Sequence, residues 1–163
     1  MTDKDLAAHA WDIIDANRYL TLGTADREGR PWTSPVYFAP QNHRVYYWIS
    51  STDARHSRNL AERPQASVVI FDSTVPAYHG RAVFAIGEAR ALDGGELDRA
   101  LAVYPGSAAR GGSPVTREDV VGAAPWRLYG LTADDLWVLC PREPGQPCPR
   151  HGLTKDHRAD VLG

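Results

Sequence analysis

Residues 46–70 read YYWISSTDARHSRNLAERPQASVVI, and this segment decides the expected fold. It begins with an aromatic run typical of a β-strand and ends with an apolar run typical of a second strand. The polar residues from Ser50 to Asp53 open a short helix between these strands. That helix has to end before Pro64, because the residue that precedes a proline avoids the helical conformation. The segment is therefore predicted to fold as strand, helix, strand.

The polar middle of this segment is the best candidate for a binding site. The first N–H groups of a helix lack partners within the helix and lie at the positive end of its dipole, so they favour an anion. Ser50, Ser51 and Thr52 add hydroxyl donors, and Arg55 can bind a phosphate through two hydrogen bonds. A phosphate would also favour the charged form of His56. The alternative interpretation is a capped surface helix with a basic exposed face.

The flanking sequence predicts further helices and strands. Thr2 and Asp5 indicate a capping box for a first helix that runs to about Asn17. Another helix is expected from Asp93 to Tyr104. The expected strands are Tyr19–Thr24, Pro31–Ala39, Arg44–Ser50, Ala66–Asp72, Arg81–Leu92, Trp126–Leu131 and Asp135–Cys140, the last two as a pair. Ala66–Asp72 is almost continuously apolar, so we expect it to be buried on both faces.

Together these elements predict a mainly β fold in one domain over residues 1–163. Six or seven antiparallel strands with accessory helices fit a small closed or split β-barrel best. The length of 163 residues and the hydrophobic content of 43% are typical of one globular domain. Ala108–Ala124 is rich in Gly, Ser and Pro and is expected to be a loop, with one helical turn at Thr116–Val121.

Composition excludes several functional classes. The formal net charge of −2 argues against a general nucleic-acid-binding protein, which carries a basic face. No apolar run is long enough to span a bilayer, so no membrane partner is expected. Met1–Ala10 is polar and acidic and lacks the features of a signal peptide, which predicts a cytoplasmic protein.

Tyr46–Ile70 resembles, without a gap, the central FMN-binding segment of the pyridoxamine-phosphate oxidase family. Ser50 and Ser51 stand where that family has a Thr-Asn pair, and Ala54-Arg55-His56 stands where it has Ser-Arg-Lys. In the family the Arg and the Lys hold the FMN phosphate, so the resemblance implies this role for Arg55 and His56. Histidine in place of lysine carries less positive charge at neutral pH.

The resemblance extends in both directions from this segment. Leu22–Val36 is similar to the first hairpin of the family, whose second strand runs beside the flavin ring. This implies cofactor contacts for Thr33, Ser34 and Val36. Near the C-terminus, Trp137 matches a tryptophan that lies near the flavin of the partner subunit in the family, and Arg158 belongs to a segment that resembles the closing His-Asp-Arg. The resemblance therefore adds Trp137 and Arg158 to the cofactor-binding residues.

Two departures from the oxidases limit what the resemblance implies. The oxidases carry an Arg and a Lys on the strand occupied here by Thr33–Phe38, and their Arg-x-His substrate clamp is not reproduced by Thr154-Lys155-Asp156. We therefore do not expect oxidation of pyridoxamine phosphate. The resemblance implies a split-barrel homodimer that binds FMN between its subunits and acts as an oxidoreductase on an unidentified small molecule.

Two alternatives to an FMN oxidoreductase stay open at the level of sequence. One is a reductase that depends on a deazaflavin, and the other is a non-enzymatic split-barrel protein that carries a flavin or haem. No side chain stands out as a general acid or base, so no catalytic residue is assigned.

The two cysteines are not arranged as a CxxC pair. Cys140 closes an apolar run and is expected to be a small core residue. Cys148, His151 and His157 have a spacing that faintly resembles a set of metal ligands. A structural zinc site needs four ligands, and the sequence does not indicate a fourth, so no metal site is predicted.

Overall fold

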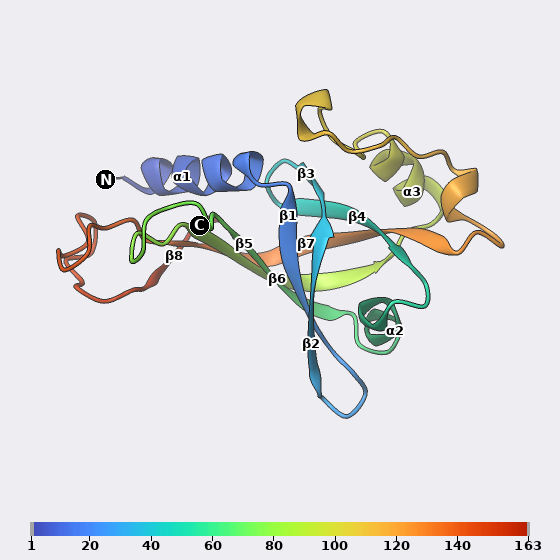
Figure 1. The fold of residues 1–163 in the computed structure, drawn as a ribbon, viewed down its shortest axis with the longest axis horizontal. Coiled ribbons are helices and arrows are strands. Elements are labelled where there is room, and N and C mark those ends of the chain that lie inside the picture. The colour runs from blue at the N-terminus through green and yellow to red at the C-terminus, as the bar shows by residue number, and fades with distance from the viewer. Residues whose placement is uncertain (1, 163) are drawn as a thin grey trace.

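An antiparallel β-sheet forms the centre of the structure, a computed structural model that describes residues 2–162 (Figure 1). Along the sheet the strand order is β2-β1-β5-β6-β7-β4-β3, and β8 pairs with β7. The strands are β1 (Tyr19–Ala25), β2 (Pro31–Tyr37), β3 (Ala39–Gln41), β4 (Val45–Ser51), β5 (Gln65–Phe71), β6 (Ala82–Ala91), β7 (Trp126–Leu139) and β8 (Arg158–Asp160). The sheet curls into a half-barrel, which confirms the predicted mainly β fold of the split-barrel type.

The helices lie outside the sheet. The structure has α1 (Asp3–Ala16), α2 (Arg55–Glu62), α3 (Gly94–Leu101) and the short 3-10 turns η1 (Ala108–Arg110) and η2 (Glu118–Val120). The capping box of α1 is confirmed, because Asp5 N donates to Thr2 Oγ1 at 3.3 Å and Thr2 N donates to Asp5 Oδ2 at 2.6 Å. Within residues 2–162 no helix is long and apolar enough to cross a membrane.

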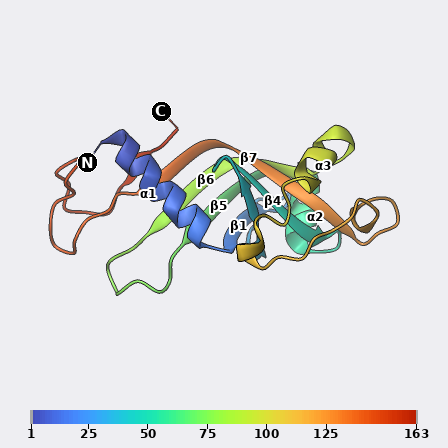
Figure 2. The ribbon, with the colours of Figure 1, turned by 90° about the horizontal axis from the view of Figure 1, so that it is seen from above.

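The main hydrophobic core lies between the sheet and α1, which crosses the sheet obliquely (Figure 2). The apolar stripe of α1 consists of Leu6, Ala10, Ile13 and Ile14, all buried. These residues recur at the three- and four-residue spacing of one helix face, which explains why α1 packs there. A second, smaller core lies around α3 and joins Leu97 and Ala100 to Tyr47, Val120 and Leu128.

One face of the sheet has no covering layer of its own. The prediction that the strand at Ala66–Asp72 is buried on both faces is wrong, because burial alternates along β5. Val68 and Ile70 point into the core, whereas Phe71 is 50% exposed. Strand register places six apolar side chains on the uncovered side, and we call this set the open face: Pro35, Val69, Phe71, Phe84, Ile86 and Trp137.

The strand β7 also differs from the sequence prediction. Trp126–Leu131 and Asp135–Cys140 were expected to form two paired strands, but they are parts of one strand of 14 residues. No glycine or proline lies between them to make a turn. The register instead shifts at Asp134, which lies opposite the step from Ile86 to Gly87 and forms a β-bulge. The bulge lets β7 bend and pair with β6 over almost its whole length.

Other boundaries shift by a few residues. The helix predicted to reach Tyr104 ends at Leu101, and Asn42 and His43, both with positive φ, lie in the turn between β3 and β4. The predicted loop at 108–124 holds η1 and η2, and β8 was not predicted. A strand of three residues is too short to give a periodic signal.

Gly87 provides a test of the bulge. A Cβ atom at this position would overlap the carbonyl oxygen of Thr132 on β7, which is backbone and cannot rotate away. We expect Gly87→Ala to lower the free energy of unfolding by about 1–3 kcal/mol, measured by urea denaturation. Gly95→Ala is the control, because its Cβ would meet only Arg99 Nη1 at 3.6 Å. Equal stability of the two variants would contradict this account of the bulge.

Candidate functional site

Three of the predicted cofactor-binding residues meet at the start of α2. His56 Nδ1 lies 3.0 Å from Ser34 Oγ on β2, and His56 Nε2 lies 2.7 Å from Ser50 Oγ on β4. The imidazole is only 9% exposed. Residues from two strands and a helix therefore form one hydrogen-bonded network at the end of the half-barrel.

Burial sets the charge of His56. Desolvation lowers the pKa of His56 below its usual value, because the charged form loses its hydration. A neutral imidazole has one N–H donor and one acceptor nitrogen, and two serine hydroxyls can satisfy both. The sequence suggested a charged histidine beside a phosphate, but the side chain as it lies here is a neutral, doubly hydrogen-bonded group.

Arg55 points away from this network and packs on Trp32. Its guanidinium carbon lies 4.6 Å from the centre of the Trp32 ring, and Trp32 Nε1 donates a hydrogen bond to Ser34 Oγ at 3.0 Å. Arg55 Nη2 is also 3.9 Å from Asp26 Oδ2, and the arginine side chain is 42% exposed. The site therefore presents an accessible cation that is held over an aromatic ring.

The start of α2 differs from the predicted anion cradle. The helix begins at Arg55 with Ala54 as its N-cap, and no side chain caps it. Ser50 and Ser51 belong to β4, where Ser50 Oγ contacts His56 and Ser51 Oγ accepts a hydrogen bond from Asp53 N at 3.2 Å. Ser50 Oγ thus meets the first turn of α2 through His56, whereas Ser51 Oγ accepts a hydrogen bond and can still donate its own hydroxyl proton.

Strand alternation separates the three residues predicted on β2. Ser34 and Val36 point to the inner side, and Val36 is buried in the core opposite Leu20. Thr33 points to the opposite side with the open face. A ligand cannot reach the Val36 side chain without opening the core, so only the backbone of Val36 is available for the predicted contact.

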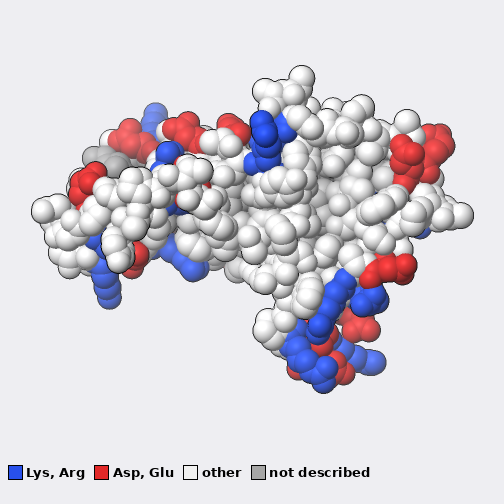
Figure 3. Space-filling view, in the orientation of Figure 1, with Lys and Arg blue, Asp and Glu red and all other residues white. Residues whose placement is uncertain are grey.

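A groove of about 600 Å³ lies where Thr33 meets the open face. Trp32 forms part of its wall, but the Trp32 ring points to the Ser34 side of β2, where Arg55 packs on it. The residues that line the groove include Gly23, Trp32, Thr33, Ile86, Asp134 and Asp135. On the face of the molecule shown in Figure 3, charged side chains gather at the tip of the β1–β2 hairpin and near α2. The centre of the face in this view is uncharged.

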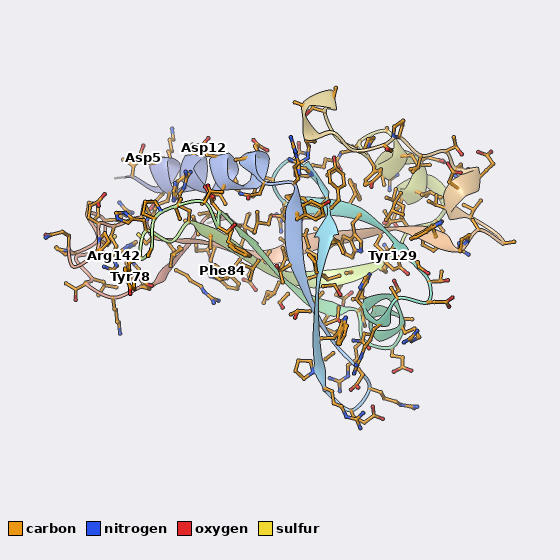
Figure 4. The ribbon with its side chains drawn as sticks, in the orientation of Figure 1. Asp5, Asp12, Tyr78, Phe84, Tyr129 and Arg142 are labelled. Carbon is orange, nitrogen blue, oxygen red and sulfur yellow. The ribbon has the colours of Figure 1, made fainter. Side chains whose placement is uncertain are left out.

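The last two predicted residues lie far from α2 within one chain. Trp137 pairs with Phe84 on β6 and with Asp160 on β8, and Arg158 Cζ lies 3.8 Å from the centre of the Phe84 ring. Figure 4 labels Phe84 on the side of the sheet away from α2. Contact between these residues and a ligand at Arg55 would need a second subunit.

Sequence reasoning missed one buried contact of the site. Asn59 Nδ2 donates to Thr24 Oγ1 at 3.0 Å, and both residues are buried. This bond ties α2 to β1 beside the His56 network. The only signal in the sequence is the amide residue Asn59 next to the apolar Leu60. This combination is also common on surface helices.

A family model described as pyridoxamine 5'-phosphate oxidase matches residues 6–139. The chain belongs to this family. The match covers the strands and helices described above from α1 to β7, including the network at His56. It ends before the Pro-rich loop and β8.

Several proteins that are similar to this chain are named for haem. A segment of 58 residues is 40% identical to the haem oxygenase HutZ of Vibrio cholerae, covering 36% of this chain and 32% of that protein. The chain thus matches only about a third of the length of this curated relative. The structure of a haem-binding protein from Mycobacterium smegmatis superposes with a TM-score of 0.68 at 22% identity, over 96% of this chain and 58% of that one. The crystal structure of HutZ, named as a haem storage protein, gives 0.63 at 24% identity, over 83% and 96%.

The buried His56 predicts a pH dependence of stability. Unfolded His56 binds a proton at about pH 6.5, whereas folded His56 stays neutral to lower pH. The unfolded state therefore binds more protons, and the free energy of unfolding falls as the pH drops below about 6.5. We expect His56→Gln, which keeps hydrogen-bonding atoms but does not titrate, to lower this slope by at most about 1.4 kcal/mol per pH unit.

Urea denaturation across this pH range measures the slope. His43→Gln is the control, because His43 lies away from the site beside Asp15. His9 is also held neutral by burial, which lowers its pKa, so part of the wild-type slope remains in both variants. Identical slopes for wild type and His56→Gln would show that His56 titrates alike in the folded and unfolded states.

Proposed function

We propose that this protein binds haem, as a non-enzymatic member of the pyridoxamine 5'-phosphate oxidase family. The observation that carries the proposal is the state of His56, a neutral buried imidazole where the flavin-binding proteins that the sequence resembles have a lysine. The similarity to the Vibrio cholerae and Mycobacterium smegmatis proteins, which are named for haem, supports haem as the ligand.

The groove beside Trp32 fits a flat ligand with anionic groups at one end. Its volume of about 600 Å³ is in the range of cofactor sites, and Ile86 and the adjoining open face offer apolar surface for a macrocycle. Arg55, which packs on the Trp32 ring, is the cation proposed for a propionate. Asp134 and Asp135 line the groove too, and their negative charge would direct the carboxylates away from them.

His56 suits a role near a metal because only a neutral imidazole can bind one. Its contact with one serine would fix the tautomer, while the other nitrogen could turn to a ligand. Both nitrogens are hydrogen-bonded here, so one serine contact has to break first. Bound haem would supply the iron, whereas Trp32, Arg55 and His56 would hold and orient it.

FMN is the second candidate, and a deazaflavin is a variant of it. The observation that favours a flavin is that Ser50, Arg55 and His56, at the family positions for the phosphate, lie together at one end of α2. Thr33 would then approach the ring from the groove, and Trp137 and Arg158 would come from the partner subunit. Against it stand the buried His56, whose pKa is lowered by desolvation, and the Ser50 hydroxyl, which is already hydrogen-bonded to His56.

We propose that the chain forms a homodimer through the open face. Its side chains form an apolar strip across adjacent strands, and a soluble monomer rarely leaves such a surface in water. Two copies related by a twofold axis would cover each other's strip and enclose the groove. The dimer would also bring Trp137 and Arg158 of one subunit toward α2 of the other.

The first test is a titration of cofactor-free protein with haem, followed by absorbance. We expect a saturable shift of the Soret band at one haem per chain. Arg55→Ala should weaken binding by about three- to tenfold, the loss of one partly exposed charge contact. Arg30→Ala is the matched control, because Arg30 approaches the same Asp26 carboxylate at 3.8 Å but does not stack on Trp32.

The same protein is then incubated with FMN and passed through a gel-filtration column. Retention of flavin absorbance together with no Soret shift would overturn the haem proposal in favour of FMN. Reduction of a retained flavin by NADH or NADPH would further indicate an oxidoreductase. His56→Ala should move the Soret maximum of the haem complex if His56 lies beside the iron.

The dimer is tested by light scattering after gel filtration. We expect wild type to have the mass of two chains and Ile86→Lys to shift toward one, because Ile86 is 43% exposed at the centre of the open face. A buried lysine pair across a twofold axis would be strongly unfavourable. Tyr78→Lys is the control, since Tyr78 is exposed on a loop outside the open face. A wild-type monomer at working concentration would contradict the dimer.

A further inference from the structure

Four potential metal ligands converge at the end of the sheet opposite α2. They are Cys140, Cys148, His151 and His157, and one ligand atom from each lies within 4.8 Å of all the others. We propose that these four side chains bind one Zn²⁺ ion. All four residues lie just beyond the segment matched by the family model, which ends at residue 139, and the site is separate from the proposed haem site.

The backbone holds two of the ligands together. Cys140 follows the last residue of β7 directly, and His157 precedes the first residue of β8 directly. These strands pair, and Cys140 N donates a hydrogen bond to His157 O at 3.0 Å. The two side chains are therefore neighbours because of sheet pairing, although 17 positions separate them in the numbering.

The other two ligands lie on a tight turn. Cys148 and His151 are three positions apart, and Gly152 N donates to Cys148 O at 2.8 Å. Gly152 has a φ of +68°, which favours glycine at this position. Arg150 N also points at Cys148 Sγ, at 3.4 Å. A backbone N–H directed at a sulfur stabilises the thiolate form, which is the form that binds a metal.

The distances between ligand atoms suit a tetrahedral ion. With Zn–S of about 2.3 Å and Zn–N of about 2.0 Å, the edges of the tetrahedron are about 3.3–3.8 Å. Cys140 Sγ and Cys148 Sγ lie 3.5 and 3.7 Å from His151 Nδ1, and the two sulfurs lie 3.0 Å apart. His157 Nε2 lies 3.0 Å from His151 Nδ1. Regular coordination needs the two sulfurs to separate by about 0.8 Å and the longest ligand pair, within 4.8 Å, to approach by about 1 Å.

The tautomer of His157 is set for binding. Its Nδ1 lies 3.1 Å from Lys155 O, and a carbonyl oxygen only accepts, so the proton sits on Nδ1. The lone pair of His157 Nε2 then points at the other ligands. Metal-binding histidines commonly donate their second N–H to a backbone carbonyl in this way.

Ligand types select zinc and a structural role. Two thiolates with two imidazoles at tetrahedral spacing are typical of zinc, and four protein ligands leave no position for a substrate. Both cysteines are buried, at 3% and 1% exposure, and both are free thiols. The segment from Pro141 to Asp156 has no helix or strand, so a metal would hold it where regular secondary structure does not.

The experiment measures the metal content of untagged, reduced full-length protein by mass spectrometry of the elements. We expect one zinc per chain in wild type and a loss of at least about tenfold in Cys148→Ser and in His151→Ala. His79→Ala is the matched control, since His79 lies on a neighbouring loop outside the cluster, and it should keep its zinc.

A second measurement uses the wild-type protein alone and so does not depend on whether a variant folds. Zinc is removed with a chelator and replaced by Co²⁺, which should give the visible bands of a tetrahedral site and thiolate charge-transfer absorption. Chelation should also lower the melting temperature, and zinc should restore it.

Three outcomes would overturn the proposal. They are metal-free protein with two reactive thiols and no cobalt bands, a disulfide between Cys140 and Cys148 in freshly purified protein, and stoichiometric iron in place of zinc. Zinc that stays in Cys148→Ser would likewise exclude this site as its location.

Discussion

The long strand β7 is the element on which the rest of the structure depends. It pairs with β6 along almost its whole length, with β4 at its beginning and with β8 at its end. The first part of β7 supports the strand that carries Ser50, and its end carries Cys140 (Figure 1). The bulge at Asp134 allows one continuous strand to serve both ends, because it bends the strand without breaking the hydrogen bonds on either side.

The chemistry near α2 follows from desolvation. A lysine at the position of His56 would need an anion or would have to reach solvent, because a buried charge without a partner is unfavourable. A histidine can lose its proton and accept burial, and two serines then satisfy its nitrogens. The exchange leaves Arg55 as the accessible cation of the site, held by its contact with Trp32. In the proposed haem complex, Arg55 would bind one carboxylate.

The open face links the proposed ligand site to assembly. Its apolar strip, the groove beside Thr33 and the residues Trp137 and Arg158 all lie on the uncovered side of the sheet or at its edge. Within one chain Trp137 lies far from α2, and the proposed twofold dimer would bring the two together. The proposed zinc site needs no second subunit, because all four ligands come from one chain. The two proposals are therefore independent.

The sequence by itself determined the mainly β class, the capping box of α1, the strand–helix–strand segment at 46–70 and the family. These features depend on neighbours in the chain, so periodicity and local hydrogen bonding reveal them. Tertiary structure decided the rest. It joined the two halves of β7, buried His56 between two serines and brought Cys140 to Cys148, His151 and His157. Each outcome depends on strand pairing or burial between residues far apart in the chain, and spacing along the sequence carries no record of either.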